Sequence, residues 1–208
     1  MAGECLELLL GLETPVRFIR GNGDRAVLAL ARVGDASGIP EAHRAAMRWE
    51  AEQLSDEQAD AIASWPETVR IEVEGLGGVL FCHATPRSDS EIFTRETPEG
   101  SLRAIFEAAG ASVVVCGHTH MAFDRMIGDV RVVNAGSVGM PFGEDGAHWL
   151  RLGPGVEPRR TTYDAHAAGE RIRACGHPGA EEFVAQNVLS TPLERDMLDM
   201  FRRAELRA

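Results

Sequence analysis

The sequence is poor in cysteine, in basic residues and in long apolar runs. Its four cysteines form no Cys-x-x-Cys pair, which argues against a disulfide framework and indicates a reducing, cytoplasmic setting. No stretch approaches the roughly 18 apolar residues that a membrane-spanning helix needs. The first residues also lack the basic segment that begins a signal peptide. We therefore expect a cytoplasmic protein that has no membrane as a partner.

Acidic residues outnumber basic ones by 32 to 21, so the formal net charge is −11. The phosphates of DNA and RNA repel an acidic chain, which argues against a nucleic-acid backbone as the main partner. The length of 208 residues and the apolar fraction of 44% are those of an ordinary globular protein with one core. We expect a single domain over residues 1–208, with a helical C-terminal segment from about residue 165.

Apolar periodicity divides the chain into helices and strands. The first 15 residues are expected to form an amphipathic helix, with Leu6, Leu9 and Leu10 at helical spacing, and Val16–Arg25 a short strand that ends in a Gly-Asn-Gly-Asp turn. The other expected helices lie at 41–65, with a break near Leu54, and at 97–111. The other expected strands lie at 68–75, 77–86, 112–120, 121–139 (two strands joined at Gly128-Asp129), 147–153 and 158–164. This order predicts a mixed α/β domain of layers with a partly antiparallel sheet.

Polar residues of unusual type fall at the ends of these strands. They are Asn22, His83, His118, His120 and Asn134. In α/β sheets, the loops beyond the carboxyl ends of the strands are where sites are built. His118 and His120 flank a threonine directly after a β-branched strand, so the two imidazoles can bind one ion or two adjacent ions. Imidazoles together with an amide oxygen suit Mn²⁺, Fe²⁺, Zn²⁺ or Ni²⁺.

Simpler interpretations apply to most of these residues when each is taken alone. A single histidine at a strand end is more often a hydrogen-bonding loop residue than a ligand, and Asn-Gly is by itself an ordinary turn. The pair in Gly-His-Thr-His is harder to explain in this way. Cys82 and Cys116 end apolar runs and are interpreted as core residues. The remaining histidines are interpreted as structural or solvent-exposed: His43, His148, His166 and His177.

Four segments, "RGNGD", "FCHATP", "VVVCGHTH" and "VVNAGSVGMP", occur in this order between Arg20 and Pro141. They resemble the later motifs of the calcineurin-like metallophosphoesterase family, and most closely its small bacterial phosphodiesterase branch, which carries Gly-Asn-x-Asp. The resemblance implies a four-layer α-β-β-α sandwich that hydrolyses small phosphate esters with two divalent metal ions, Mn²⁺ above all, with Fe, Zn or Ni as alternatives. It also implies that Asn22, His83 and His118 bind one metal and that His120 binds the other.

The sequence departs from the family pattern at two places. Many members have a histidine after the motif asparagine that protonates the leaving group, whereas this chain has Gly23, which points to aryl or diester substrates. The family also begins with Asp-x-His on a first strand and Gly-Asp on a second, and this chain starts on the helix expected to follow both. We therefore expect either that the reading frame starts earlier, with these ligands encoded upstream of Met1, or that this chain is a cut-down form. The chain as given is expected to hold at most one weakly bound ion and to be prone to self-association.

Other functions stay open at this stage. The family fold also serves as a non-catalytic scaffold or binding protein, although such a protein has no need to keep four ligand residues together. A metal-free regulatory domain is a third possibility. Arg25 and Arg87 lie next to the ligand motifs and could bind a phosphate with both guanidinium nitrogens, or they could be ordinary surface residues.

Overall fold

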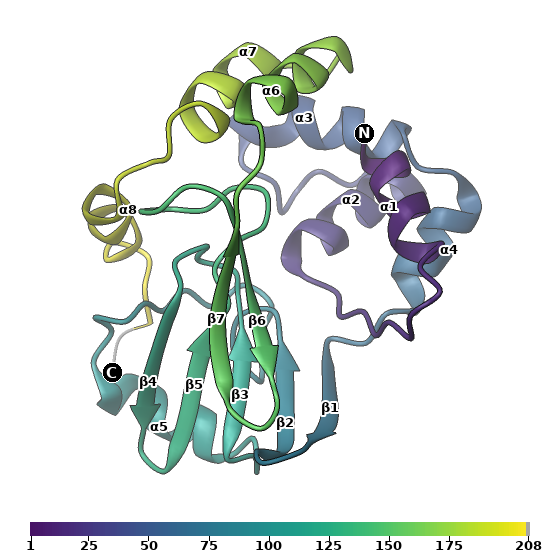
Figure 1. The fold of residues 1–208 in the computed structure, drawn as a ribbon. Helices are drawn as coiled ribbons and strands as arrows, with labels where there is room; N and C mark the ends of the chain where they lie inside the picture. Colours follow the sequence, from purple (N-terminus) through teal and green to yellow (C-terminus); the bar gives the residue numbers. More distant parts are fainter. Residues whose placement is uncertain (207–208) are drawn as a thin grey trace.

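A five-stranded sheet in the order β1-β2-β3-β5-β4 forms the centre of the computed structural model, which describes residues 1–206 (Figure 1). β2, β3 and β5 run parallel, and the edge strands β1 and β4 run antiparallel to their neighbours. All four residues of β3 are buried, as expected for a parallel strand that is covered on both faces. The strands are β1 Thr68–Val73, β2 Gly77–Cys82, β3 Val113–Cys116, β4 Phe123–Ile127 and β5 Val130–Asn134.

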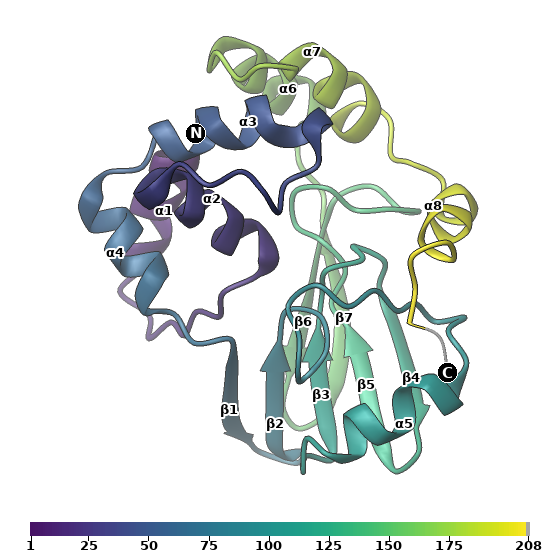
Figure 2. The same ribbon diagram turned by 180° about the vertical axis from the view of Figure 1, so that it is seen from behind.

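Two different layers cover the faces of this sheet (Figures 1 and 2). Helix α5, Glu99–Glu107, packs on one face, where Leu102 and Phe106 join the core cluster of Val114 and Val132. On the other face lies a two-stranded ribbon formed by β6, Ala147–Leu152, and β7, Val156–Thr161. Leu150 and Leu152 of the ribbon pack against valines of β2 and β3. The expected α/β fold with two facing sheets is confirmed.

The remaining helices lie beside and above the sheet (Figure 2). The first four form a group with two hydrophobic clusters of their own, centred on Leu28 and on Leu30. The C-terminal helices begin at Ala165, and the loop between α6 and α7 contacts α3 where His177 packs edge-on against Trp49. These helices are α1 Ala2–Leu10, α2 Asn22–Val33, α3 Glu41–Glu52, α4 Asp56–Ser64, α6 Ala165–Ala174, α7 Ala180–Phe183 with a π-helical turn at Val184–Val188, and α8 Glu194–Phe201. No helix among residues 1–206 is long and apolar enough to cross a membrane.

Most of the expected elements occur where the pattern places them. The three antiparallel pairs β1–β2, β4–β5 and β6–β7 all form. The turn between β4 and β5 contains Gly128 at φ 58°, a conformation that glycine adopts without strain. Helix α4 begins at Ser55, whose hydroxyl accepts a hydrogen bond from Gln58 N, while the Gln58 side chain accepts one from Ser55 N. Cys82 and Cys116 are buried, as expected of core residues.

The expected strand at Val16–Arg25 is wrong. Residues 16–20 are irregular, and Asn22 already begins helix α2. A strand needs a neighbour that supplies a hydrogen-bond ladder, and this segment instead makes a single backbone bond from Arg20 N to Pro66 O. Phe18 stacks on Trp65 at a centroid distance of 4.7 Å. The Asp24 carboxylate accepts the Gly21 N–H at 2.8 Å, so the glycine and asparagine belong to a helix start and not to a turn.

Only part of the expected apolar face of α1 is buried. Leu6 is buried against Leu28 and Ile62. Leu9 and Leu10, which were expected on the same apolar face, are 44% and 47% exposed. Helices α2 and α4 contact only one stripe of α1, so the adjoining residues of α1 stay in contact with solvent.

Phe106 provides a test of this packing. Its side chain is fully buried beneath α5 and its ring packs at 5.2 Å from that of Phe93. Phe106→Ala should lower the free energy of unfolding by about 3–5 kcal/mol, because it leaves a cavity in the main core. Urea denaturation followed by circular dichroism measures this loss. Val33→Ala, at a residue that is 77% exposed, should change it by less than about 0.5 kcal/mol; equal effects of both changes would contradict this description of the core.

Candidate metal centre

The sheet topology brings the strand-end histidines to one edge. His83 follows β2 and His118 follows β3, two strands that lie side by side and point the same way. Beyond the strands, Gly117 N donates a hydrogen bond to the His83 carbonyl at 2.9 Å, which fixes the two loops against each other. Asn22 reaches the same place from the first turn of α2.

Asn22, His83 and His118 converge on one another. His83 Nε2 lies 2.8 Å from Asn22 Oδ1 and 3.2 Å from His118 Nδ1. Two ligands that each lie roughly 2.0–2.2 Å from a common ion are about 3 Å apart, so these separations suit neighbours in one coordination sphere. The three residues, which are up to 96 positions apart in sequence, therefore meet as the strand-end pattern predicts.

The chemistry of this group of atoms fits a cation. The Asn22 oxygen is an acceptor, and each neutral imidazole carries one nitrogen with a lone pair. The tautomer of each ring decides whether His83 Nε2 and His118 Nδ1 carry a proton or a lone pair. With both rings in the tautomers that leave these nitrogens unprotonated, all three atoms offer lone pairs to the same point. Among residues 1–206, no three His, Cys, Asp or Glu side chains gather closely enough to bind an ion by themselves, so the asparagine is an essential part of the group.

The loop that carries His118 and His120 is strained and tightly held. Both histidines have positive φ, 65° and 59°, a conformation that costs a residue with a side chain about 1–3 kcal/mol. Asn134, at the end of β5 and 1% exposed, holds the loop from below. Its amide nitrogen donates to Gly117 O at 2.6 Å and to Thr119 Oγ1 at 3.1 Å. This buried amide keeps the two imidazoles in place.

His120 stands apart from the group of three. Its Nδ1 lies 2.9 Å from the Met140 carbonyl oxygen, which can only accept, so Nδ1 carries the proton and Nε2 keeps its lone pair. The His120 ring packs against that of Phe142 at 5.3 Å. It lines the same cavity of about 490 Å³ as His83 and His118, which lies between the histidine loops and helices α1–α4.

Burial lowers the pKa of all three imidazoles and so favours their neutral form. The pKa of His118 is lowered to about 4, first because the ring is removed from water and then because His83 and His120 are close. Burial is likewise the largest cause of the lowered pKa of His83 and of His120. A neutral imidazole is the form that binds a metal ion, so these environments favour ligation at neutral pH.

The two arginines proposed as phosphate-binding residues are both paired with carboxylates. Arg25 binds Asp89 through two hydrogen bonds, of 2.7 and 3.0 Å, and this pairing is the main reason that the pKa of Asp89 is lowered to about 2. Arg87 binds Glu91 through two hydrogen bonds, from Nε and Nη2, that both go to Oε1. The charge of Asp89, the partner of Arg25, acts to raise the pKa of both His83 and His118.

Two glycines beside Asn22 differ in their surroundings. A Cβ on Gly21 would lie 2.7 Å from His83 Nδ1, so only glycine lets the imidazole pack against this backbone. A Cβ on Gly23 would meet nothing within 4 Å. The first glycine is thus needed to position His83, a role that the sequence signals only by the place of Gly21 directly before the asparagine.

One Asp-x-His does occur in the chain, at Asp164-Ala165-His166. It lies at the start of α6, where the Asp164 carboxylate accepts the Ala167 N–H at 2.9 Å, and both Asp164 and His166 are exposed. Asp164 therefore caps a helix and is not part of the group at the sheet edge.

Comparisons with known proteins agree with this architecture. A hypothetical protein from Pyrococcus horikoshii OT3 superposes with a TM-score of 0.71 and 21% identity, over 87% of this chain and 76% of the other. A metallophosphoesterase from Sphaerobacter thermophilus superposes with a TM-score of 0.67 and 22% identity, over 88% and 80% of the two chains. At such identities the likeness concerns the fold alone. No curated protein matched the sequence.

The family itself is settled by the sequence comparison. The family model of the calcineurin-like phosphoesterase superfamily domain matches residues 2–152, a span that begins with α1 and ends with β6. This span contains every residue of the candidate metal centre. Because the match extends over well more than half of the chain, the protein belongs to the calcineurin-like phosphoesterase superfamily.

Proposed function

We propose that the protein is a metal-dependent hydrolase of small phosphate esters, phosphodiesters in particular, that works in the cytoplasm. The observation that carries this proposal is the convergence of Asn22, His83 and His118. Membership of a phosphoesterase superfamily supports the general reaction. A divalent metal held by these three residues, with a second held by His120, would supply a Lewis acid that activates water and stabilises charge on the phosphate oxygens.

The residues of the chain have distinct tasks in this proposal. Asn22, His83 and His118 would hold one cation, and His120 would offer Nε2 to the other. Met140 O fixes the tautomer of His120, and Asn134 orients the loop that carries His118 and His120. Arg25, three residues after Asn22 on α2, would exchange part of its contact with Asp89 for a phosphate oxygen. Mn²⁺ is the proposed metal, because nitrogen and amide-oxygen ligands without thiolates suit it.

Removal of one ligand tests the activity. We expect the protein, expressed at the full length that its gene encodes, to hydrolyse bis-p-nitrophenyl phosphate when Mn²⁺ is added. His118→Ala should lower kcat/KM at least about 100-fold, a loss of about 3 kcal/mol of transition-state stabilisation. The matched control is His166→Ala, which changes an exposed histidine on α6. Hydrolysis that persists in His118→Ala, or in a strong chelator, would refute the proposal.

The two glycines provide a test of metal binding without turnover. Gly21→Ala should push the His83 ring away and weaken Mn²⁺ binding by at least about tenfold, as misplacing a ligand does in other metal sites. Gly23→Ala, two residues further on, has free space and should leave the affinity unchanged. Titration of Mn²⁺ followed by electron paramagnetic resonance of the free ion measures both. The proposal predicts a difference between the variants, and equal affinities would contradict it.

The lowered pKa of His118 predicts how stability depends on pH. The unfolded chain takes up this proton near pH 6.5, whereas the folded protein takes it up only near pH 4. The unfolded state therefore binds more protons in between, and the free energy of unfolding should fall as pH is lowered from about 6.5 toward 4. His118→Gln should flatten this decline, and the exposed-site variant His166→Gln should not. Urea denaturation in the presence of chelator measures the slope, and equal slopes for all three proteins would count against the neutral, buried imidazole.

A further inference from the structure

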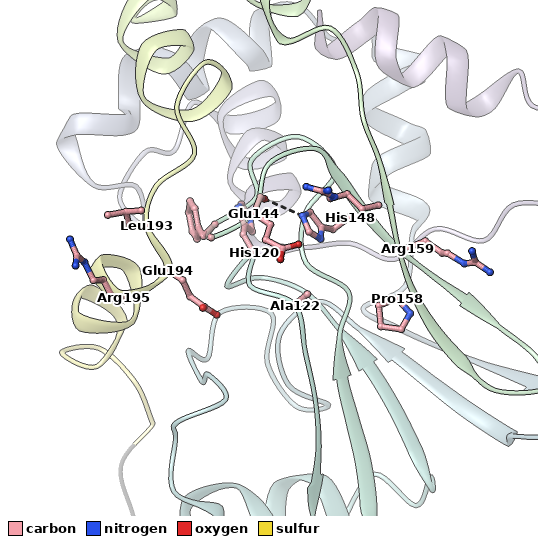
Figure 3. A pocket seen from close by; sticks show the side chains of 12 residues that line it. His120, Ala122, Glu144, His148, Pro158, Arg159, Leu193, Glu194 and Arg195 are labelled. Carbon is pink, nitrogen blue, oxygen red and sulfur yellow. Dashed lines mark hydrogen bonds between the residues drawn. The ribbon is translucent and has the colours of Figure 1, made fainter.

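A second and larger cavity opens on the other side of His120. It measures about 720 Å³ and lies between the loop after β3, the ribbon β6–β7 and the start of α8 (Figure 3). His120 lines both this cavity and the smaller one beside α1–α4. A phosphate ester bound at the histidines therefore has room for an organic group on either side of His120.

The two cavities differ in their walls. The smaller one is lined by the residues of the candidate metal centre themselves and by the acidic residues Asp24 and Glu50. The larger one has apolar walls from Phe142, Pro158 and Leu193, which suit an organic group. Figure 3 shows the guanidinium groups of Arg159 and Arg195 pointing away from His120 and His148, whereas Glu144 lies close to these two histidines. Glu194, which also lines the cavity, is paired with Arg95.

His148 lies on the wall of the larger cavity and is firmly positioned there. It belongs to β6, and its N–H donates to Ser137 O at 3.0 Å. Gly136, at φ 78°, lets it approach closely, because a Cβ on this residue would lie 2.8 Å from His148 Cβ. Gly136 is in turn held by a hydrogen bond from its N–H to the Asn134 side chain. The same buried asparagine thus positions His148 as well as the loop of His118 and His120.

The hydrogen bonds of His148 leave one nitrogen free for a ligand. His148 Nε2 lies 3.1 Å from the Glu144 carbonyl oxygen and must donate to it (Figure 3). When the ring is protonated, the second N–H, on Nδ1, is available to another acceptor. Imidazole is the side chain that most often transfers a proton in catalysis near neutral pH. Gly23, which directly follows Asn22, has no side chain to do so.

We infer that the larger cavity receives the organic group that leaves the phosphate, and that His148 donates a proton to its oxygen. This inference rests on the phosphoesterase activity proposed above. In the reaction, the oxygen of water bonds to phosphorus and this water gives up one proton to solvent, while the bond from phosphorus to the ester oxygen breaks with its electron pair left on that oxygen. The protonated His148 ring gives its Nδ1 proton to the same oxygen, so that an alcohol or phenol departs. The ring regains a proton from solvent.

A leaving-group series tests the proton transfer. Aryl phosphodiesters with p-nitrophenyl, m-nitrophenyl and phenyl groups are hydrolysed by the full-length protein with Mn²⁺, and log kcat/KM is plotted against the pKa of the phenol. His148→Gln should lose less than about threefold with p-nitrophenyl and at least about 100-fold with phenyl. The slope of the plot is therefore steeper than in the parent protein and in His166→Gln. Equal slopes in His148→Gln and the parent overturn the role of His148, including the case in which both are steep.

A binding measurement tests the cavity without turnover. Ala122 lines it and is exposed, so Ala122→Trp fills the space without disturbing the core. With Mn²⁺ present, this change should weaken the binding of phenylphosphonate at least tenfold and leave that of inorganic phosphate unchanged. Calorimetric titration measures both. Equal affinities for phenylphosphonate in the variant and the parent place the organic group elsewhere and overturn the assignment of the cavity.

The phosphoesterase activity and the role of His148 can be disproved separately. If the parent protein hydrolyses no ester with any added metal, the phosphoesterase proposal fails, and this inference fails with it. If the parent is active and His118→Ala is not, but His148→Gln reduces all three esters equally, the activity stands and His148 has only a structural role.

Discussion

The parallel pairing of β2, β3 and β5 is the constraint on which the rest of the site depends. In this register Phe81 lies opposite Val115, and Cys116 lies opposite Asn134. The three strands therefore end at nearly the same level, and the polar residues that follow them begin from one edge. The pairing continues past the strands, because Gly117 N bonds to His83 O and Ala135 N to Cys116 O. A shift of any strand by one residue would turn its side chains to the opposite face and separate the histidines.

The buried amide of Asn134 converts this alignment into a defined site. It bonds to Gly117 O, Thr119 Oγ1 and Gly136 N, so one side chain holds both the histidine loop and the loop beneath His148. Each such bond contributes about 0.5–1.5 kcal/mol. Together they are comparable to the roughly 1–3 kcal/mol that each left-handed histidine costs. The site is thus rigid because a strained loop and a buried polar group stabilise each other.

Sequence patterns predict the parts of this structure that depend on local chemistry. β3 is a run of buried valines, and the β4–β5 turn is marked by a glycine, so both are predictable from a few adjacent residues. Val16–Arg20 has the composition of a strand, but strand formation needs a partner that only the tertiary structure supplies. The meeting of Asn22, His83 and His118 follows from their places at element ends. The place of His148 does not, because it depends on the close approach of Gly136 from a separate loop; the sequence alone suggested a structural or exposed histidine.

Helices α1–α4 have hydrophobic clusters separate from those of the sheet, and this separation has a consequence for cooperativity. Within such a protein, each cluster is a unit that opens with its own free energy. Asn22 with His83 and Arg25 with Asp89 are polar contacts that link the two units directly at the site. A ligand bound by both Asn22 and His83 would act as a cross-link between helices α1–α4 and the sheet. By mass action it would stabilise the state in which the two units are in contact. Amide hydrogen exchange in the helices would then slow together with that of the sheet edge. Occupation of the site would therefore change the local opening of both units.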